Sequence, residues 1–437
     1  MEKKNLDVQS GTQGACAPIL PEKTCWSDEY LAKPAPFSAS KRELLLAVFL
    51  YVPAYLYLCG ARYAFPVFCA LFVLAVEWFY RDAPRTWESW FWLSCVAVTA
   101  YAVSFGKNRV WGDLTVLFTH AFAVYYVLCR ANRLLEGETS HLLPLDALFG
   151  LIVFPFRHFF LRIRTVGYGV SHVRSGKKAK PAVLMFAALG FTLAVGLLIL
   201  AVQDLSRADA AFSDAAAQIF SALRFKVNGA VLWNAVLSLP VGAYLFGLIA
   251  GTGRESLEGV RARGQKVNAA ISALHKIPMA LWTAVLGVFA LVYAAFFVLQ
   301  AGYLFGAFTK AVPEGYTVAE YARQGFFSLC RVMAVNFALL WLVTRWGAKP
   351  VRENKGTLAL SVLLLTQSLA FAAVAASKLH LYIDIYGFTP LRFQSAWLIG
   401  VLSCGAVCAA ISLLTGKKTF RIWTMLSAAA LTLLSLY

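Results

Sequence analysis

The sequence predicts an all-α integral membrane protein: a polytopic transmembrane helix bundle of about 11 spans, with an inner re-entrant or interfacial element. Three observations predict this fold class: composition, the length of the apolar runs, and the position of the basic residues. Of the 437 residues, 60% are hydrophobic and 14% are charged. A soluble domain carries roughly 25% charged residues, so this composition is typical of a chain that is solvated by lipid.

Each predicted span is an apolar run of bilayer-crossing length, which is roughly 17–25 residues for a helix. The runs are residues 43–60, 62–80, 88–105, 113–130, 181–203, 228–251, 278–306, 326–345, 357–377, 393–415 and 420–437. Another apolar run, residues 141–163, contains two prolines and the polar residues Asp146, Arg157 and His158. We therefore expect an interfacial or re-entrant pair of helices there, in which Asp146 pairs with Arg157 and His158.

The basic residues predict the orientation. The net charge is +18, and most of the 40 lysines and arginines lie in the tail or in alternate connections between the apolar runs. Basic connections stay in the cytoplasm beside anionic lipid, so we expect a cytoplasmic N-terminus and an outer C-terminus. The expected partners are lipids of the inner leaflet. Nucleic acid is excluded, because no soluble basic domain is present to bind it.

Four regions follow from these patterns. We expect a disordered cytoplasmic tail at 1–42, a four-span unit at 43–135, a basic cytoplasmic or interfacial element at 136–180, and a seven-span unit at 181–437. The nine cysteines show no metal-ligand spacing, and no familiar nucleotide-binding or catalytic motif is present. We therefore expect no metal and no cofactor, and the sequence assigns no catalytic residue.

Two polar segments lie on the predicted outer face. In the first, residues 316–327, Thr317 and Glu320 have the spacing of a capping box, and Arg331 lies deeper in the same span, where it needs a partner. The second, residues 378–392, ends one helix at Gly387 and starts the next at Pro390. Together they form a candidate polar site of Glu320, Tyr321, Arg323, Arg331, Lys378, Tyr382, Asp384, Tyr386 and Arg392. The alternative is a salt-bridge network that only fixes the helix packing.

Other polar or small residues inside the runs have structural interpretations. Glu77 lies near a span end and is expected to be an interfacial acid, and His120 is expected to be a hydrogen-bonded packing histidine. Gly247 and Gly251 form a GxxxG step, which allows two helices to approach closely.

The chain resembles a bacterial family of multi-pass inner-membrane proteins that has no assigned function. The resemblance rests on "YTVAEYARQGFFSL" at 316–329 and "KLHLYIDIYGFTPLRF" at 378–393, supported by "ADAAFSD" at 208–214, "LQAGYLFGAF" at 299–308 and "LPLDALFGLIVFPF" at 143–156. It covers most of residues 140–415. The resemblance implies the fold and a place in the bacterial cytoplasmic membrane, and it implies no activity.

Three functions stay open. A transporter or permease-like component would use the outer polar site as an entry, and an intramembrane arginine with outward carboxylates favours it. A membrane-embedded enzyme would act on an outer-leaflet lipid or envelope precursor, although no catalytic set supports this class. A membrane sensor or assembly partner would bind another membrane protein. The substrate and the oligomeric state do not follow from the sequence.

Overall fold

The computed structural model describes residues 37–60, 63–106, 112–173, 229–299, 315 and 317–436. Within these ranges the chain is α-helical, and the only strand-like feature is an isolated bridge between Ile277 and Gly347. Residues 39–437 form one compact unit. The predicted all-α class is therefore confirmed. Residues 1–36 of the predicted tail and the predicted span at 181–203 lie outside the described residues, and the described end of the tail already enters a helix at Lys41.

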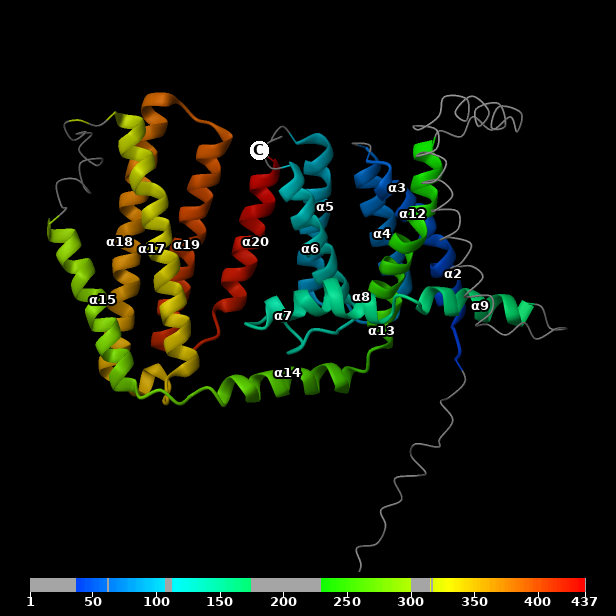
Figure 1. The fold of residues 1–437 in the computed structure, drawn as a ribbon, viewed down its shortest axis with the longest axis horizontal. Coiled ribbons are helices and arrows are strands. Elements are labelled where there is room, and N and C mark those ends of the chain that lie inside the picture. The colour runs from blue at the N-terminus through cyan, green and yellow to red at the C-terminus, as the bar shows by residue number, and fades with distance from the viewer. Residues whose placement is uncertain are drawn as a thin grey trace, which may run out of the picture. The chain divides into compact units, whose positions relative to one another are not determined.

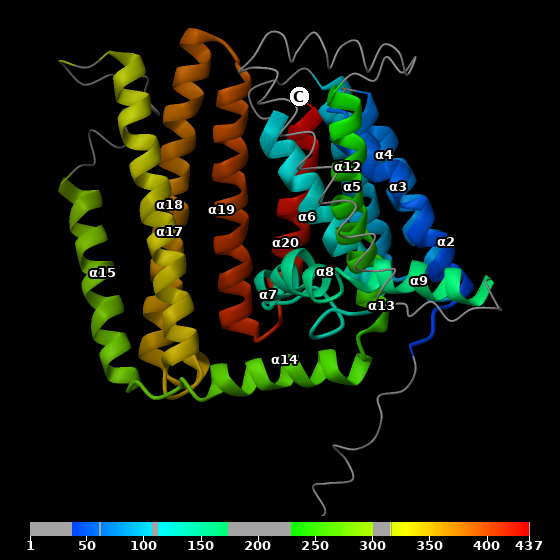
Figure 2. The same ribbon diagram turned by 45° about the vertical axis from the view of Figure 1, so that its right-hand side comes forward.

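A first group of helices comes mostly from the N-terminal part of the chain (Figures 1 and 2). It contains α2 (Lys41–Phe49), α3 (Tyr51–Leu58), α4 (Ala64–Phe79), α5 (Trp87–Phe105), α6 (Gly112–Arg130), α12 (Gly229–Phe246) and α20 (Phe420–Leu436). Consecutive helices pack as neighbours, as their short connections require. Two members come from farther along the chain, because α12 packs on α3 and the C-terminal α20 packs on α5.

A second group is built around α18. It contains α15 (Met279–Leu299), α17 (Val318–Trp346), the 3-10 turn η3 (Val351–Glu353), α18 (Lys355–Tyr386) and α19 (Pro390–Thr415). Helices α15, α17 and α19 each pack against α18. Apolar side chains such as Met333, Phe371 and Leu364 are almost completely buried between them.

A third set of elements lies across the direction of these helices at one end (Figures 1 and 2). It contains α7 (Leu143–Leu148), the π-helical turn η1 (Phe149–Val153), α8 (Phe154–Arg157), α9 (Leu161–Val173) and α14 (Leu257–Ser272). The run at 141–163 thus lies crosswise to the helices of both groups. The helix α12 continues toward this end through a second π-helical turn, η2 (Gly247–Gly251), and α13 (Thr252–Arg254).

The prediction of about 11 spans is not supported. Among the described residues, five helices are long and apolar enough to cross a membrane: Gly229–Arg254, Met279–Leu299, Ala319–Trp346, Lys355–Tyr386 and Pro390–Thr415. A sixth counts only if the bent pair Leu143–Arg157 and Leu161–Ser171 is one span, and both views show α9 lying crosswise. The chain is therefore a membrane protein with five such helices in its described part.

The other described runs fall short of the length or the hydropathy of these five helices for physical reasons. The run at 43–60 forms two short helices that meet at Leu50, where Pro53 has no N–H to donate to the carbonyl of Phe49. Three runs give shorter apolar helices, Ala64–Phe79, Leu114–Arg130 and Phe420–Leu436. Helix α5 is 19 residues long, but it contains Glu88 and several serine and threonine residues. It is therefore less apolar than the five helices above.

The helix ends follow the predicted signals. Thr317 and Glu320 form the capping box of α17, with both reciprocal bonds present. Helix α18 ends at Gly387, whose φ of 77° favours glycine, and α19 begins with Pro390 in its first turn. These local sequence signals are therefore confirmed.

The tight contact at η2 leads to the first prediction. A Cβ at Gly247 would lie 2.5 Å from the carbonyl oxygen of Pro155, whereas a Cβ at Gly400 on α19 would meet no atom within 4 Å. We expect Gly247→Ala to lower the free energy of unfolding by about 1–3 kcal/mol through overpacking. Gly400→Ala is the matched control and is expected to be neutral or slightly stabilising. Thermal unfolding of the purified variants in one detergent measures both, and equal losses would contradict the close contact.

Candidate functional site

Two residues of the predicted outer site, Tyr321 and Lys378, meet between α17 and α18. Both side chains have an exposed fraction of 0%. The ammonium nitrogen of Lys378 lies 4.1 Å from the centroid of the Tyr321 ring, which is the geometry of a cation–π contact. Gly325 makes room for this nitrogen, because a Cβ there would lie only 2.7 Å from it. The two polar segments are therefore joined at this contact.

Three more predicted residues gather where α18 ends and α19 begins. The guanidinium carbon of Arg392 lies 4.0 Å from the ring centroid of Tyr382 and 5.8 Å from that of Tyr386. The two tyrosine rings pack edge to face at 5.1 Å, and Arg392 also donates to the carbonyl of Gly387. This group holds the turn between the helices and leaves aromatic surface at the predicted outer end.

The predicted carboxylates have partners on their own helices. Glu320 accepts hydrogen bonds from the amide and hydroxyl of Thr317, at 3.1 and 2.8 Å. Asp384 lies 3.6 Å from Nδ1 of His380. The structure therefore joins the two segments through Tyr321 and Lys378.

The predicted arginines of α17 differ from each other. Arg331 is exposed on the helix surface, and its guanidinium lies 3.5 Å from the hydroxyl of Ser328. The same face carries Phe327 and Trp341, which are 62% and 57% exposed. The side chain of Arg323 lies outside the described part of the structure.

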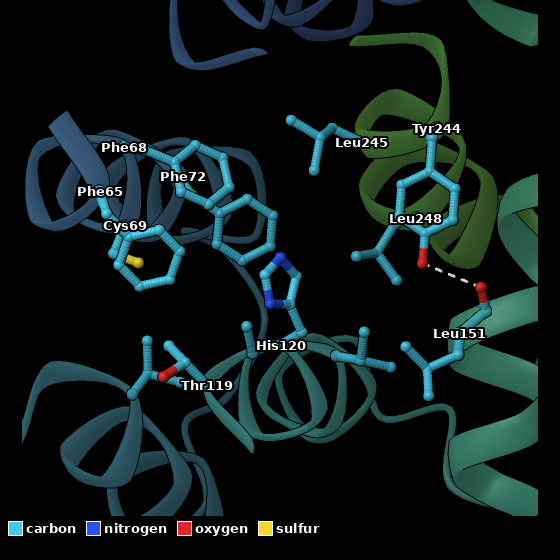
Figure 3. A pocket seen from close by; sticks show the side chains of 13 residues that line it. Phe65, Phe68, Cys69, Phe72, Thr119, His120, Leu151, Tyr244, Leu245 and Leu248 are labelled. Carbon is cyan, nitrogen blue, oxygen red and sulfur yellow. Dashed lines mark hydrogen bonds between the residues drawn. The ribbon is translucent and has the colours of Figure 1, made fainter. Parts of the chain in front are cut away.

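A second candidate site, which the sequence did not reveal, is a cavity in the first group of helices. Its volume is about 50 Å³, and it lies between α4, α6, α12 and the two π-helical turns (Figure 3). We call it the His120 cavity. It is lined by Phe65, Phe68, Cys69, Phe72, Val96, Thr119, His120, Ala123, Val124, Leu151, Tyr244, Leu245 and Leu248. The lining is almost wholly apolar.

His120 is the main polar group of the cavity. Its Nδ1 lies 2.7 Å from the carbonyl oxygen of Val116 and donates to it. In the neutral ring Nε2 is then an acceptor, and this tautomer follows from the hydrogen bond. The ring also packs against Tyr57, with 5.4 Å between centroids. His120 is thus a hydrogen-bonded packing histidine, as predicted, and it also presents an acceptor to the cavity (Figure 3).

Both π-helical turns contribute to the cavity wall. The turn η1 supplies Leu151, whose carbonyl accepts a 2.8 Å hydrogen bond from the hydroxyl of Tyr244, and η2 supplies Leu248. Turns of this kind are rare and occur frequently at functional sites. Two segments that are distant in the sequence therefore place the same rare backbone form against one cavity.

Glycines allow the two turns to pack closely. A Cβ at Gly150 would lie 2.5 Å from Val124, and one at Gly251 would lie 2.5 Å from Cβ of His158. The close approach that the GxxxG step predicts is therefore confirmed, with Gly247 and Gly251 both facing the α8 segment.

A buried carboxylate, Glu255, follows directly after α13. It accepts from Nε2 of His158 at 2.9 Å and from Arg263 at 2.7 Å, and it lies 3.1 Å from Arg157. The Nε of Arg133 donates to the backbone carbonyl of Glu255 at 2.7 Å. We call Glu255, His158, Arg157 and Arg263 the Glu255 cluster. It ties α8, α13 and α14 together.

The Glu255 cluster corrects one prediction. Arg157 and His158 pair with Glu255, whereas Asp146 accepts a hydrogen bond from the backbone amide of Leu135. Burial raises the pKa of Glu255, but hydrogen bonds from His158 and Arg263 and the nearby positive charges lower it further, so the pKa lies below its ordinary value.

A second ionic group ties α4 to α6. Glu77 accepts from Arg85 at 2.7 Å, from the hydroxyl of Tyr126 at 2.6 Å and from Arg130 at 3.2 Å. Arg130 is only 1% exposed and also donates to the carbonyl of Tyr80. The expected interfacial acid, Glu77, is thus the partner of a buried arginine.

A protein-family comparison identifies the chain. The model of a family described as a domain of unknown function, DUF4153, matches residues 68–437. The chain belongs to this family. The match to DUF4153 begins in α4 and includes the outer polar site and all of the His120 cavity except Phe65, so it extends farther toward the N-terminus than the motifs of the predicted resemblance. No curated protein and no solved structure matches this DUF4153 protein.

The Glu255 cluster leads to a prediction about pH. Because the pKa of Glu255 is lowered, its carboxylate contributes stability above the ordinary glutamate pKa of about 4.3, and this contribution is lost as the pH falls through the lower value in the folded protein. We expect Glu255→Gln to lower the free energy of unfolding by about 1.5–3 kcal/mol at neutral pH. We also expect this free energy to depend less steeply on pH in the acid range than it does in the wild type.

The control is Glu258→Gln, on the exposed surface of α14. Thermal unfolding measured from neutral to acid pH separates the two variants. If both variants behave as the wild type does at neutral pH, Glu255 does not hold these helices together.

Proposed function

We propose that this protein is a permease-like membrane protein that passes a small, mostly apolar molecule through the His120 cavity. The observation that carries the proposal is that η1 and η2, two interruptions of helical geometry, line the same cavity. Interrupted helices that meet inside a bundle are typical of substrate sites in membrane transporters.

The lining indicates the chemistry of the solute. Phe65, Phe68 and Phe72 offer aromatic surface, and Nε2 of His120 offers one hydrogen-bond acceptor. A matching molecule is apolar or aromatic and carries a single hydrogen-bond donor. A volume of about 50 Å³ holds little more than one or two water molecules. The structure therefore corresponds to a closed form in this proposal, and passage requires the π-helical turns to move.

The Glu255 cluster is the proposed inner gate. It lies directly after η2 and α13 and contacts α8, which follows η1. A rearrangement of either π-helical turn shifts one side of these ion pairs against the other. Ion pairs of this kind have discrete arrangements, which suits a gate with two states.

The outer polar site has a supporting role in the proposal. Lys378 with Tyr321, and Arg392 with Tyr382 and Tyr386, form cation–π contacts at the predicted outer end of the second group. We propose that these contacts stabilise the entry side of the protein in the bacterial inner membrane, with the N-terminus in the cytoplasm and the C-terminus outside. The shorter helices α4, α6 and α20 also lie in the membrane in this arrangement.

The proposal predicts that Cys69, which lines the cavity, becomes accessible to water as the protein changes state. A variant that retains only Cys69 is reconstituted in proteoliposomes and treated with a charged, membrane-impermeant thiosulfonate. We expect labelling of Cys69, and we expect Ala123→Trp to slow it, because the indole fills the cavity that Ala123 lines.

The matched control uses the same helix. Leu74 on α4 is 61% exposed and faces away from the bundle, so the L74C variant, without the native cysteines, is expected to face lipid and to resist the charged reagent. If Cys69 and the L74C thiol react only with a permeant reagent, water does not reach the cavity and the permease proposal fails.

A further inference from the structure

Asp146 on α7 is a buried acid with an unused oxygen. It is 1% exposed, and its Oδ1 accepts a 2.8 Å hydrogen bond from the amide of Leu135. Its Oδ2 is buried and has no hydrogen-bond partner among the described residues. A carboxylate in this position leaves negative charge on a buried Oδ2 that no hydrogen bond compensates among the described residues, whereas a protonated acid is neutral. The geometry thus favours the protonated form.

The nearby basic groups are occupied by other partners. Arg421 on α20 forms ion pairs with Glu88 and Glu138, and Arg261 on α14 lies 3.4 Å from the side-chain oxygen of Asn132. Glu88 is itself buried and accepts from the amide of Thr139 at 3.1 Å and from its hydroxyl at 2.9 Å. The described residues therefore contain no ion pair for Asp146.

Asp146 is surrounded by titratable groups from several elements. The groups that face it or influence its charge are Glu88 on α5, Tyr125 and Cys129 on α6, Glu136 in the loop after α6, and Arg261 on α14, with Arg421 on α20 acting on Cys129. α7 lies crosswise, outside the spanning helices. Burial raises the pKa of Asp146 to about 7, and the negative charges of Glu136 and Glu88 add to this rise, while the amide of Leu135 and Arg261 oppose it.

The acid is connected to the His120 cavity by a short path. Asp146 lies just before η1, in which Gly150 is pressed against Val124 and Leu128 of α6. Val124 and Leu151 of η1 both line the cavity. Because Gly150 and Val124 are packed with no free space between them, a shift of α7 and η1 moves Val124 and Leu151 in the cavity wall.

We propose that Asp146 is a proton-binding site that controls the His120 cavity: the protonated acid keeps α7 and η1 packed in the closed form, and loss of the proton loosens them. The proton binds to Oδ2, and its loss leaves a buried negative charge that water or a cation must reach. This inference rests on the proposed function for the role of the cavity, and it adds the ion that regulates it.

Infrared spectroscopy of the full-length protein in lipid nanodiscs tests the proton site. A protonated buried carboxyl group has a separate carbonyl stretching band, and we expect the wild type to lose this band as the pH rises through about 7. Asp146→Asn keeps an oxygen for the amide of Leu135 and removes the titration, so its spectrum is expected to lack the band. Glu258→Gln is the control and retains it. A band that persists in Asp146→Asn, or no titrating band in the wild type, overturns the assignment.

Alkylation of Cys69 by a permeant maleimide tests the control of the cavity. Both proteins retain Cys69 as the only cysteine, so the intrinsic pH dependence of the thiol cancels between them. We expect the alkylation rate to rise more steeply above neutral pH with Asp146 present than in Asp146→Asn. Equal pH profiles overturn the coupling to the cavity. The infrared band does not depend on transport, so failure of the permease proposal and failure of the proton site give different results.

Discussion

The contact between the two π-helical turns and the helices beside them depends on the absence of side chains at three glycines. Gly150 faces α6, and Gly247 and Gly251 face the segment of Pro155 and His158 at distances that a Cβ would not permit. This contact lets the crosswise segment reach the inside of the first group of helices. The His120 cavity and the Glu255 cluster both follow from it, because each uses residues from the two sides of the same crossing.

The fold was predictable where the determinants are local. Capping at Thr317, the stop at Gly387 and the start at Pro390 act within one helical turn, and each is confirmed. The number of spans was not predictable from hydropathy alone. The average hydropathy of the run at 43–60 is high, but it does not reveal that the run folds as two short helices near Pro53. The candidate site was predicted only in part. The sequence placed the polar segments at 316–327 and 378–392 on one face, and the structure brings Lys378 of one against Tyr321 of the other. The pairing of His158 with Glu255 joins residues far apart in the sequence, and no local pattern signals it or a π-helical turn.

Many of the arginines are paired with acidic side chains of the same chain. Arginines at the predicted cytoplasmic connections were expected to face anionic lipid, and several instead bind carboxylates of the same chain. The pairs are Arg254 with Glu43, Arg263 with Glu255, Arg85 and Arg130 with Glu77, and Arg421 with Glu88. A guanidinium group suits this use because it makes two parallel hydrogen bonds to a carboxylate, as Arg254 does. The connections between helices are therefore held by ion pairs of the same arginines from which the sequence predicts the orientation.

The place of α20 has a consequence for biosynthesis. This last helix packs on α5, and its Arg421 reaches Glu88 at the start of that helix. α5 thus emerges from the ribosome long before α20, and the first group of helices stays incomplete until α20 has been made. During that interval the surface of α5 and the carboxylate of Glu88 need a temporary cover, from lipid or from an insertion factor. Truncated chains that lack α20 are accordingly expected to be recognised as unfinished by cellular quality control.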